Sequence, residues 1–337
     1  MSTGALIMQK AQELEFLASA IIPYPSFAEY TQGLDARVES FPHSRGHYEA
    51  LYNQGKPIEG ARSLIVCTQG YHSYQVPPGL QGRIGKMYLF DNRLSYAPQY
   101  RLRQEFETYL KTLGLKLLPG GVPSRWAAVK AGLAKFGRNN FVYDSRAGSY
   151  IIVHTWVTDA ELDYQGNKEE PHHPLCREDC RKCIEACPTR ALSGDFSMDR
   201  GACIAQLSFF GKEDMDPDLR REMGQWLYGC DVCQDVCPIN KDALQQKETF
   251  PLLKEFEAHL ELKAILDMDE ESYQQILNPR FSYIGKDNLW LWKWNALRAM
   301  INSGEQSYHS VISKYCEDPD ERLKNLALWG KAVLELK

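Results

Sequence analysis

Eight of the ten cysteines fall into two runs with the spacing of a bacterial ferredoxin. Each run ends in C-x2-C-x3-C-P, where the cysteine before the proline binds the other cluster of a [4Fe-4S] pair. The spacing therefore predicts two clusters with crossed ligands. Cluster A is expected to be bound by Cys176, Cys180, Cys183 and Cys237. Cluster B is expected to be bound by Cys187, Cys203, Cys230 and Cys233.

Other uses of the cysteines are weaker alternatives. A structural zinc site needs four ligands and gives no reason for a proline after the last cysteine. A disulfide framework is typical of small secreted domains, and this chain has 337 residues. His172 and His173 lie beside Cys176 and are alternative ligands, although a solvated loop is the simpler interpretation. Cys67 and Cys316 lie outside both runs and are expected to be buried small hydrophobic residues.

The composition is that of a globular protein with room for a sizeable core. The chain is 44% hydrophobic and 25% charged. Its formal net charge is -5, so it has no overall positive charge of the kind that attracts nucleic acid. Apolar runs fall short of the roughly 20 residues that span a bilayer. No secretory or twin-arginine leader is recognisable, and cluster cysteines must stay reduced, so we expect a cytoplasmic protein.

The hydrophobic pattern predicts a mixed α and β fold around a sheet of four or more strands. Residues 1 to about 60 are expected to be helical, and strands are predicted at 63–68, 115–118 and 149–158. Helices are predicted at 99–113, at 124–134 with Ser124 as N-cap, and at 217–227. From about residue 248 the chain is expected to be helical, with paired helices at 287–302 and 318–336.

From about residue 60 to 335 the chain resembles the epoxyqueuosine reductase family. The most specific match is Y-G-C-D-V-C-Q-D-V-C-P-I-N at 228–240. Residues 125–140 are similar to the family block A-x-x-A-G-L-G-W-x-G-K-N, and 203–207, which read C-I-A-Q-L, match a further family segment.

The resemblance implies an α/β (α+β) fold in three parts. A cobalamin-binding core related to nitroreductases and reductive dehalogenases would cover 1–165, a ferredoxin-like double-cluster module 166–245, and HEAT-like helices 246–337. In such a protein, two clusters pass electrons to cobalamin, which reduces the epoxide of a queuosine precursor in tRNA. The cofactor-binding positions carried over by the resemblance are Gly132, Leu133, Gly137, Arg138, Asn139, Ser149 and Tyr150. A low-potential donor of the flavodoxin or ferredoxin type is the implied partner, with no membrane.

The chain departs from the family pattern at the residue implied to protonate the substrate. Gly120 stands where the family has an Asp, and a glycine cannot act as a general acid. Tyr88 is our first candidate for a replacement and His72 our second; the alternative interpretation is a core aromatic and a loop residue. Three tryptophans at alternating positions in 290–294 favour packing or a partner surface over a phosphate-binding face.

The sequence therefore predicts an iron–sulfur, cobalamin-dependent reductase whose substrate is not necessarily epoxyqueuosine. One alternative is a true epoxyqueuosine reductase acting on tRNA. Another is a reductive activator or electron carrier for a corrinoid protein, in which the loss of the Asp would have no consequence.

Overall fold

The computed structural model describes residues 1–164, 175–194, 196–211, 215–245 and 247–335. Its main sheet has four antiparallel strands in the order β1-β2-β6-β3. The strands are β1 (Ala18–Pro23), β2 (Ser63–Gly70), β6 (Ile151–Thr158) and β3 (Leu117–Leu118). β2 and β6 pair along their whole length, from Ser63 opposite Thr158 to Gly70 opposite Ile151.

Both faces of this sheet are apolar, because side chains alternate between the faces along each strand. In β2, Leu64 and Val66 belong to one hydrophobic cluster, whereas Ile65 and Cys67 belong to another. A continuous apolar run such as S-L-I-V-C is therefore what a strand covered on both faces needs. Cys67 is fully buried, as expected of a small hydrophobic residue.

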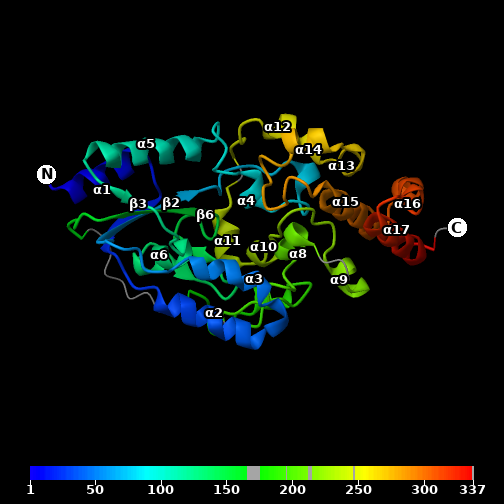
Figure 1. The fold of residues 1–337 in the computed structure, drawn as a ribbon, viewed down its shortest axis with the longest axis horizontal. Helices are drawn as coiled ribbons and strands as arrows, with labels where there is room; N and C mark the ends of the chain where they lie inside the picture. The colour runs from blue at the N-terminus through cyan, green and yellow to red at the C-terminus, as the bar shows by residue number, and fades with distance from the viewer. Residues whose placement is uncertain (165–174, 195, 212–214, 246, 336–337) are drawn as a thin grey trace.

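Helices cover each face, as Figure 1 shows. On one face lie α1 (Thr3–Glu13) and α5 (Pro98–Thr112), whose buried residues pack on Ile65 and Cys67. On the other lie α2 (Ala28–Ser40) and α6 (Ser124–Lys130). The short helices α3 (Gly46–Glu49) and α4 (Lys86–Leu89) and the hairpin of β4 (Lys135–Phe136) and β5 (Val142–Tyr143) complete this part.

The cysteine-rich segment consists of short helices joined by turns. These are α7 (Lys182–Glu185), α8 (Ile204–Phe210), α9 (Pro217–Glu222), α10 (Val232–Asp235) and α11 (Pro238–Ala243). Single-turn 3-10 helices occur at Pro42–Ser44, Ala50–Asn53, Pro78–Leu80, Glu257–Leu260 and Gln306–Tyr308.

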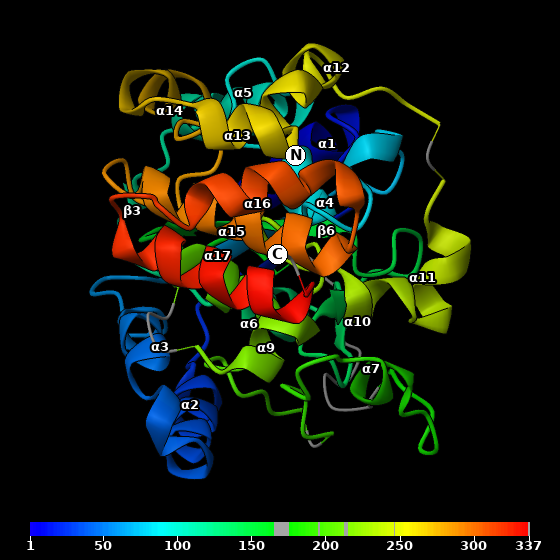
Figure 2. The same ribbon diagram turned by 90° about the vertical axis from the view of Figure 1, so that its right-hand side faces the viewer.

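The C-terminal part is helical and is organised around α15 (Leu289–Ser303). The remaining helices are α12 (Leu253–Phe256), α13 (Leu262–Asp267), α14 (Glu270–Ile276), α16 (His309–Tyr315) and α17 (Glu321–Val333). Figure 2 shows α15, α16 and α17 layered together, with α13 beside them. No helix in the described ranges is both long and apolar enough to cross a bilayer.

α15 ties this helical part to the cysteine-rich segment. Asn295 Nδ2 donates to the backbone oxygens of Ser208 and Leu227, each at 3.0 Å. The buried Arg298 guanidinium donates to the carbonyls of Gly224 and Trp226. These bonds satisfy backbone carbonyls of α8 and of the segment 224–227 that would otherwise be buried without a partner.

Several element boundaries differ from the sequence-based predictions. The first 60 residues are not all helical, because Ala18–Pro23 forms β1 on the edge of the sheet. Ser124 is the first residue of α6 rather than its cap, and no side chain caps that helix. The predicted helix at 217–227 ends at Glu222, and α17 is capped by Asp320, one residue after Pro319. The predicted boundary at 165–166 and His172 and His173 lie outside the described residues.

Two of the three tryptophans of α15 are packing residues. Trp292 is fully buried and stacks on Tyr228, with ring centroids 5.5 Å apart and planes 6° apart. Trp294 is 7% exposed. Trp290 is half-buried, and the Arg322 guanidinium lies 4.0 Å from its ring centroid.

We expect Trp292→Ala to lower the free energy of unfolding by about 3–5 kcal/mol, because it leaves a large cavity beside Tyr228. Trp290→Ala on the same helix is the matched control and should cost clearly less. Urea unfolding followed by circular dichroism measures both. Equal midpoint shifts for the two variants would contradict the packing described above.

Candidate functional site

Four cysteines from both runs lie close together in the cysteine-rich segment. The Cys183 thiol lies within electrostatic reach of Cys176, Cys180 and Cys237. The same four side chains line one cavity of about 280 Å³. Cys237 therefore joins the first run across the fold rather than the cysteines nearest to it in sequence.

The other four cysteines form a second group. Cys230 lies within electrostatic reach of Cys203 and Cys187, and Cys233 of Cys230 and Cys203. Cys203 immediately precedes α8, and Cys230 and Cys233 bracket the start of α10. Within the described residues, no three His, Cys, Asp or Glu side chains converge as they would on one metal ion.

The β4–β5 hairpin of the core contacts both cysteine groups. The Arg138 backbone N–H lies 3.4 Å from Cys176 Sγ, and the Tyr143 hydroxyl donates to Cys237 Sγ at 3.4 Å. Asn139 Nδ2 lies 2.8 Å from the Tyr143 hydroxyl and 3.1 Å from the Cys233 carbonyl oxygen. The hairpin therefore links the two groups through side chains that are themselves buried.

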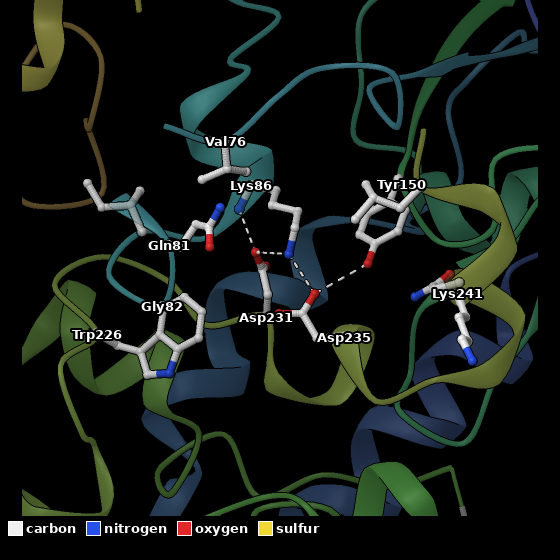
Figure 3. Close-up of a pocket in the computed structure, with 12 residues that line it drawn as sticks. Val76, Gln81, Gly82, Lys86, Tyr150, Trp226, Asp231, Asp235 and Lys241 are labelled. Atoms are coloured by element: carbon white, nitrogen blue, oxygen red, sulfur yellow. Dashed lines mark hydrogen bonds and ion pairs between the residues drawn. The ribbon is translucent and has the colours of Figure 1, made fainter. Parts of the chain in front are cut away.

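An ion-pair network joins α4 to the loop that carries Cys230 and Cys233. The Lys86 ammonium lies 3.3 Å from Asp231 Oδ2 and 2.5 Å from Asp235 Oδ1, and the Lys86 backbone N–H donates to Asp231 at 2.7 Å (Figure 3). Burial alone would lower the pKa of Lys86, but the two carboxylates raise it above its ordinary value. Lys86 thus remains charged and holds both carboxylates in place.

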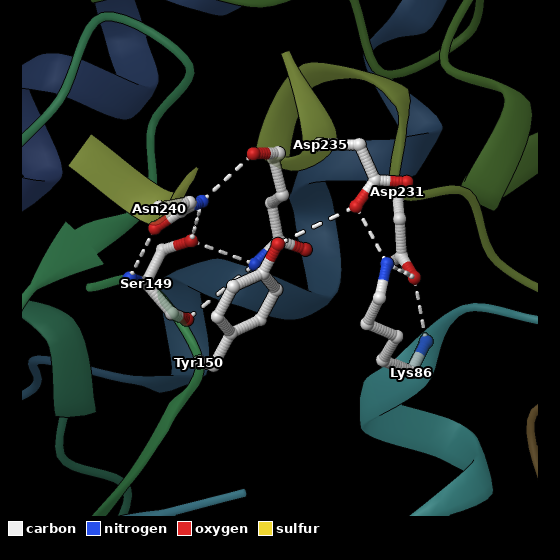
Figure 4. Close-up of polar contacts among 7 residues, drawn as sticks. Lys86, Ser149, Tyr150, Asp231, Asp235 and Asn240 are labelled. Atoms are coloured by element: carbon white, nitrogen blue, oxygen red, sulfur yellow. Dashed lines mark hydrogen bonds and ion pairs between the residues drawn. The ribbon is translucent and has the colours of Figure 1, made fainter. Parts of the chain in front are cut away.

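A second polar network lies next to this ion-pair network and reaches α11. Ser149 Oγ accepts hydrogen bonds from Gln234 Nε2 at 2.9 Å and Asn240 Nδ2 at 2.8 Å, and Asn240 Oδ1 accepts from the Ser149 N–H (Figure 4). The Tyr150 hydroxyl lies 3.4 Å from Asp235. Because Ser149, Gln234 and Asn240 are buried and bonded to one another, they fix the orientation of α10 and α11 on the core.

A separate cavity, with a volume of about 380 Å³, lies elsewhere in the fold. Its wall combines aromatic and cationic side chains with a few others, from α2, the segment 48–54, the start of α6, the β4–β5 hairpin, the segment 198–200 and position 283. They include Tyr30, Arg37, Tyr48, Arg125, Trp126, Phe136, Asn140, Arg200 and Tyr283. This volume and mixed lining are those of a small-molecule site.

Two arginines place this cavity beside the second cysteine group. Arg125 is within electrostatic reach of Cys233, and Arg200 of Cys203. The Arg125 side chain is exposed and lines the cavity. The protein atoms around it lower its pKa. A ligand in the cavity would therefore lie next to these cysteines.

Tyr88 lies at the edge of the same region. Its ring packs edge-on against Tyr228 and Tyr283, with centroids 5.0 and 6.1 Å away, and Tyr283 lines the cavity. Gly229 adopts a φ of +77°, and a Cβ there would lie 2.5 Å from the Tyr88 ring, so only glycine fits before Cys230. Burial raises the pKa of Tyr88 well above its ordinary value, which keeps the phenol protonated at neutral pH.

His72, the second catalytic candidate, lies elsewhere. Its charge environment is set by Asp144, Glu248 and Arg146, and its carbonyl accepts from the Gln245 N–H. The structure therefore does not bring His72 and Tyr88 together.

The seven positions expected to bind the cofactor also lie away from this cavity wall. Arg138, expected to contact a corrinoid, donates from Nη1 to the carbonyls of Arg177 and Cys180. Asn139, Ser149 and Tyr150 bind the cysteine-rich segment as described above. Gly137 packs on Tyr143, Leu133 packs on the core, and Gly132 follows α6 with a φ of +71°. A cofactor-binding role for these residues stays a prediction.

Two donors on the wall have no hydrogen-bond partner in the described part of the chain. They are the Asn140 side-chain nitrogen and Arg200 Nε, and both are buried. Buried donors without acceptors are costly, so a bound group with carbonyl or phosphate oxygens would suit these positions.

Sequence reasoning missed Lys86, Arg125, Arg200 and Tyr283. Arg200 carried a weak indication, since it lies three residues before Cys203. Tyr283 carried none, because it reaches Tyr88 only through the packing of the segment after α14 on the Cys230 loop.

Comparisons with known proteins identify relatives. Residues 176–240 match the 4Fe-4S double cluster binding domain. The epoxyqueuosine reductase of Cyclobacterium marinum is 27% identical over 237 residues, which cover 68% of this chain and 74% of that protein.

Solved structures share the fold. The structure of epoxyqueuosine reductase from Streptococcus thermophilus superposes with a TM-score of 0.77 at 21% identity, covering 100% of this chain and 91% of that one. A structure of epoxyqueuosine reductase with an epoxyqueuosine-modified tRNA-Tyr stem loop gives a TM-score of 0.74 at 19% identity, covering 98% and 89%.

These findings confirm four predictions. The chain resembles the epoxyqueuosine reductases, it has their mixed helix and sheet fold with a helical C-terminal part, and it carries a double [4Fe-4S] cluster domain. Its relatives are oxidoreductases, so the predicted enzyme class is confirmed as well.

The crossed ligand sets predict how cysteine variants combine. We expect Cys187→Ala and Cys230→Ala to damage the same cluster, so the double variant should keep about half of the iron, like either single variant. Combining Cys187→Ala with Cys237→Ala should remove both clusters. Iron analysis and EPR of the reduced protein measure this. If Cys187→Ala with Cys183→Ala kept half of the iron, the ligands would not cross.

Tyr143→Phe should make the reduction potential of cluster A more negative, by roughly 20–60 mV. The hydroxyl hydrogen bond to Cys237 Sγ stabilises the added negative charge of the reduced cluster, and the variant removes it. EPR-monitored redox titration measures the shift. Tyr109→Phe on α5 is the control and should leave both potentials unchanged; an unchanged potential in Tyr143→Phe would show that the bond has no electronic effect.

Proposed function

We propose that this chain, a relative of the epoxyqueuosine reductases, is an iron–sulfur reductase that carries electrons through clusters A and B to a group in the Arg125 cavity. The ligand sets are those grouped above, four cysteines to each cluster. We also propose the three-part division into a core at 1–165, a cluster module at 166–245 and a helical part at 246–337.

One observation carries this proposal: the cavity and cluster B share a wall. Arg125 and Arg200 line the cavity, and each lies within electrostatic reach of a cluster B cysteine. The first cysteine group lines a cavity of its own together with Arg177 and Lys182. Cluster B is thus the cluster whose cysteines neighbour the cavity arginines, which suits electron entry at cluster A from a flavodoxin or ferredoxin type donor.

We propose that the group beside cluster B is cobalamin. The fit rests on the two orphaned donors, Asn140 Nδ2 and Arg200 Nε, because a corrinoid is rimmed by amide oxygens that could accept from them. Aromatic rings of Trp126 and Phe136 would pack on its apolar edge. When bound, cobalamin supplies a strongly reducing cobalt centre, and the protein supplies orientation and protons.

Tyr88 is proposed as the proton donor. Its raised pKa keeps the proton on the phenol until a strongly basic atom, such as a developing alkoxide or carbanion, is formed. The nearby charge of Arg125 opposes that rise and stabilises the phenolate once the proton has left. Tyr283, stacked on Phe209 with centroids 4.9 Å apart, holds the ring of Tyr88 from the side.

The substrate is proposed to differ from epoxyqueuosine. Gly120 has a φ of +153°, and a Cβ at this position would lie 2.4 Å from the Ile58 side chain. An Asp would therefore strain this loop unless Ile58 moved. A tRNA or a corrinoid protein remains a proposed partner, since one solved epoxyqueuosine reductase structure of the same fold holds a tRNA stem loop. The proposed location is the cytoplasm.

Anaerobic titration of the cluster-loaded protein with cobalamin tests the proposal. We expect a visible spectrum and a Co(II) EPR signal typical of base-off cobalamin. Tyr88→Phe should bind cobalamin as the unchanged protein does but lose about 100-fold or more in turnover, since it cannot supply a proton. Turnover is measured first with queuosine-precursor tRNA.

The outcomes separate the alternatives. Full activity of Tyr88→Phe would remove this residue from the mechanism. Two intact clusters without any cobalamin signal would indicate an electron carrier for another protein. Turnover of the precursor tRNA at rates like those of the relatives would instead make the chain a true epoxyqueuosine reductase.

A further inference from the structure

Two of the ligands proposed for cluster B stand at the ends of one long connection. Cys203 and Cys230 flank residues 204–229, of which the structure describes all but 212–214. Cys203 is the residue before α8, and Cys230 follows Gly229. The thiolates of a [4Fe-4S] cluster bind one compact group of metal ions, so the two ends of this connection must be held together.

Ser208 bridges the two ends. Its Oγ accepts a hydrogen bond from the Gly229 N–H at 2.9 Å, and its hydroxyl donates to the Ala205 carbonyl oxygen at 2.8 Å. Ser208 is fully buried. Ala205 is two residues after the first cysteine and Gly229 is one residue before the second, so this single hydroxyl joins the segments that carry both cysteines.

Asn295 of α15 binds the same junction from the helical part, which lies against α8 (Figure 1). Its Nδ2 atom donates to the Ser208 and Leu227 carbonyl oxygens, each at 3.0 Å. Asn295 and both of these partners are fully buried, so water does not take the place of the amide. Asn295 therefore fixes α8 against the residues just before Cys230.

The same face of α15 holds the middle of the connection. Arg298 and Asn302 donate to backbone carbonyls of the segment 220–226. Positions 295, 298 and 302 are separated by three and four residues, which places them on one side of a helix. α15 thus presents a row of three donors to the cysteine-rich segment, and Asn295 is the one whose partners lie next to the cysteine-bearing ends.

Cluster A is held in a different way. Three of its proposed ligands come from the first cysteine run, and the β4–β5 hairpin of the core contacts Cys176 and Cys237. The bonds of Asn295 end on residues that lie between two cluster B cysteines. The two clusters therefore differ in what they need from the helical part.

We propose that Asn295 and Ser208 are positioning residues for cluster B. They set the separation of its Cys203 and Cys230 thiolates. This rests on the proposed function, because it takes over the ligand set of cluster B. Cluster B is then retained only while α15 is docked on the cysteine-rich segment, whereas cluster A does not need that contact. The helical part is thereby a working component of the electron path.

Anaerobic release of iron to a chelator from the full-length, cluster-loaded protein tests the proposal. We expect Asn295→Ala to speed release from cluster B about tenfold or more, because it leaves two buried carbonyls without a donor. Release from cluster A should be unchanged. EPR of the reduced protein identifies the cluster that is lost, since Cys230→Ala supplies the spectrum of cluster A alone.

Asn302→Ala is the matched control, because it removes the same donor group from the same face of α15, while its partner carbonyls lie farther along the chain from Cys230. It should retain cluster B. Ser208→Ala should act in the same direction as Asn295→Ala, and it takes the place of that variant if Asn295→Ala does not fold. In both junction variants the g-values of the cluster B EPR signal should change, which a general loss of stability would not produce.

Release from cluster B at the rate of the unchanged protein in both Asn295→Ala and Ser208→Ala would overturn the positioning role and leave the reductase proposal standing. An equally fast loss of cluster B in Asn302→Ala would also overturn it, since lower stability of the whole protein would then explain the result. If the unchanged protein itself held fewer than two clusters, the proposed function would fail and this inference with it.

Discussion

The arrangement depends on one interaction, the contact of the buried Lys86 ammonium with the buried Asp231 and the more exposed Asp235. These carboxylates alternate with Cys230 and Cys233 along the chain, so fixing them fixes the loop that bears both cysteines. A buried charge pair is not by itself a strong stabiliser, but removing one partner strands the other in a medium of low polarity. The pair therefore acts mainly on geometry: it allows one register of this loop against α4 and disfavours the rest.

From that contact outward, three parts of the chain meet around the same short segment. Ser149 and Tyr150 of the core hold α10 and α11 from one side. Trp292 of the helical part stacks on Tyr228 from another. The cysteine-rich segment has few long helices and little apolar surface of its own, so its neighbours provide the rigidity that it lacks.

The sequence predicted those features that depend on local pattern. The cysteine spacing is one of them, because ligand geometry constrains neighbouring residues directly. The strands at 63–68 and 149–158 are others, since an apolar run covered on both faces has few alternatives. β1 was not predicted, because its residues continue the apolar pattern of α1. Its pairing with Ser63–Gly70 is also a contact between distant segments, which local pattern does not indicate.

The site was less accessible to such reasoning. Arg138 and Asn139 lie in the expected block, yet they turn toward the cysteines, because the β4–β5 hairpin brings them to Cys176 and Cys233. Tyr88 and Tyr283 are separated by almost 200 positions, and only the tertiary packing brings their rings together. Residue identity fixed what chemistry was available, while long-range contacts decided which groups share a cavity.

The two cysteine groups differ in how closely protein surrounds them, and this affects how their clusters would react with dioxygen. Cys176, Cys180, Cys183 and Cys237 line a cavity, whereas Cys203, Cys230 and Cys233 are more closely surrounded by protein atoms. In the arrangement that we propose, dioxygen would meet cluster A first. Bleaching would then proceed in two phases, and a half-bleached preparation would keep cluster B while having lost the proposed entry point for electrons.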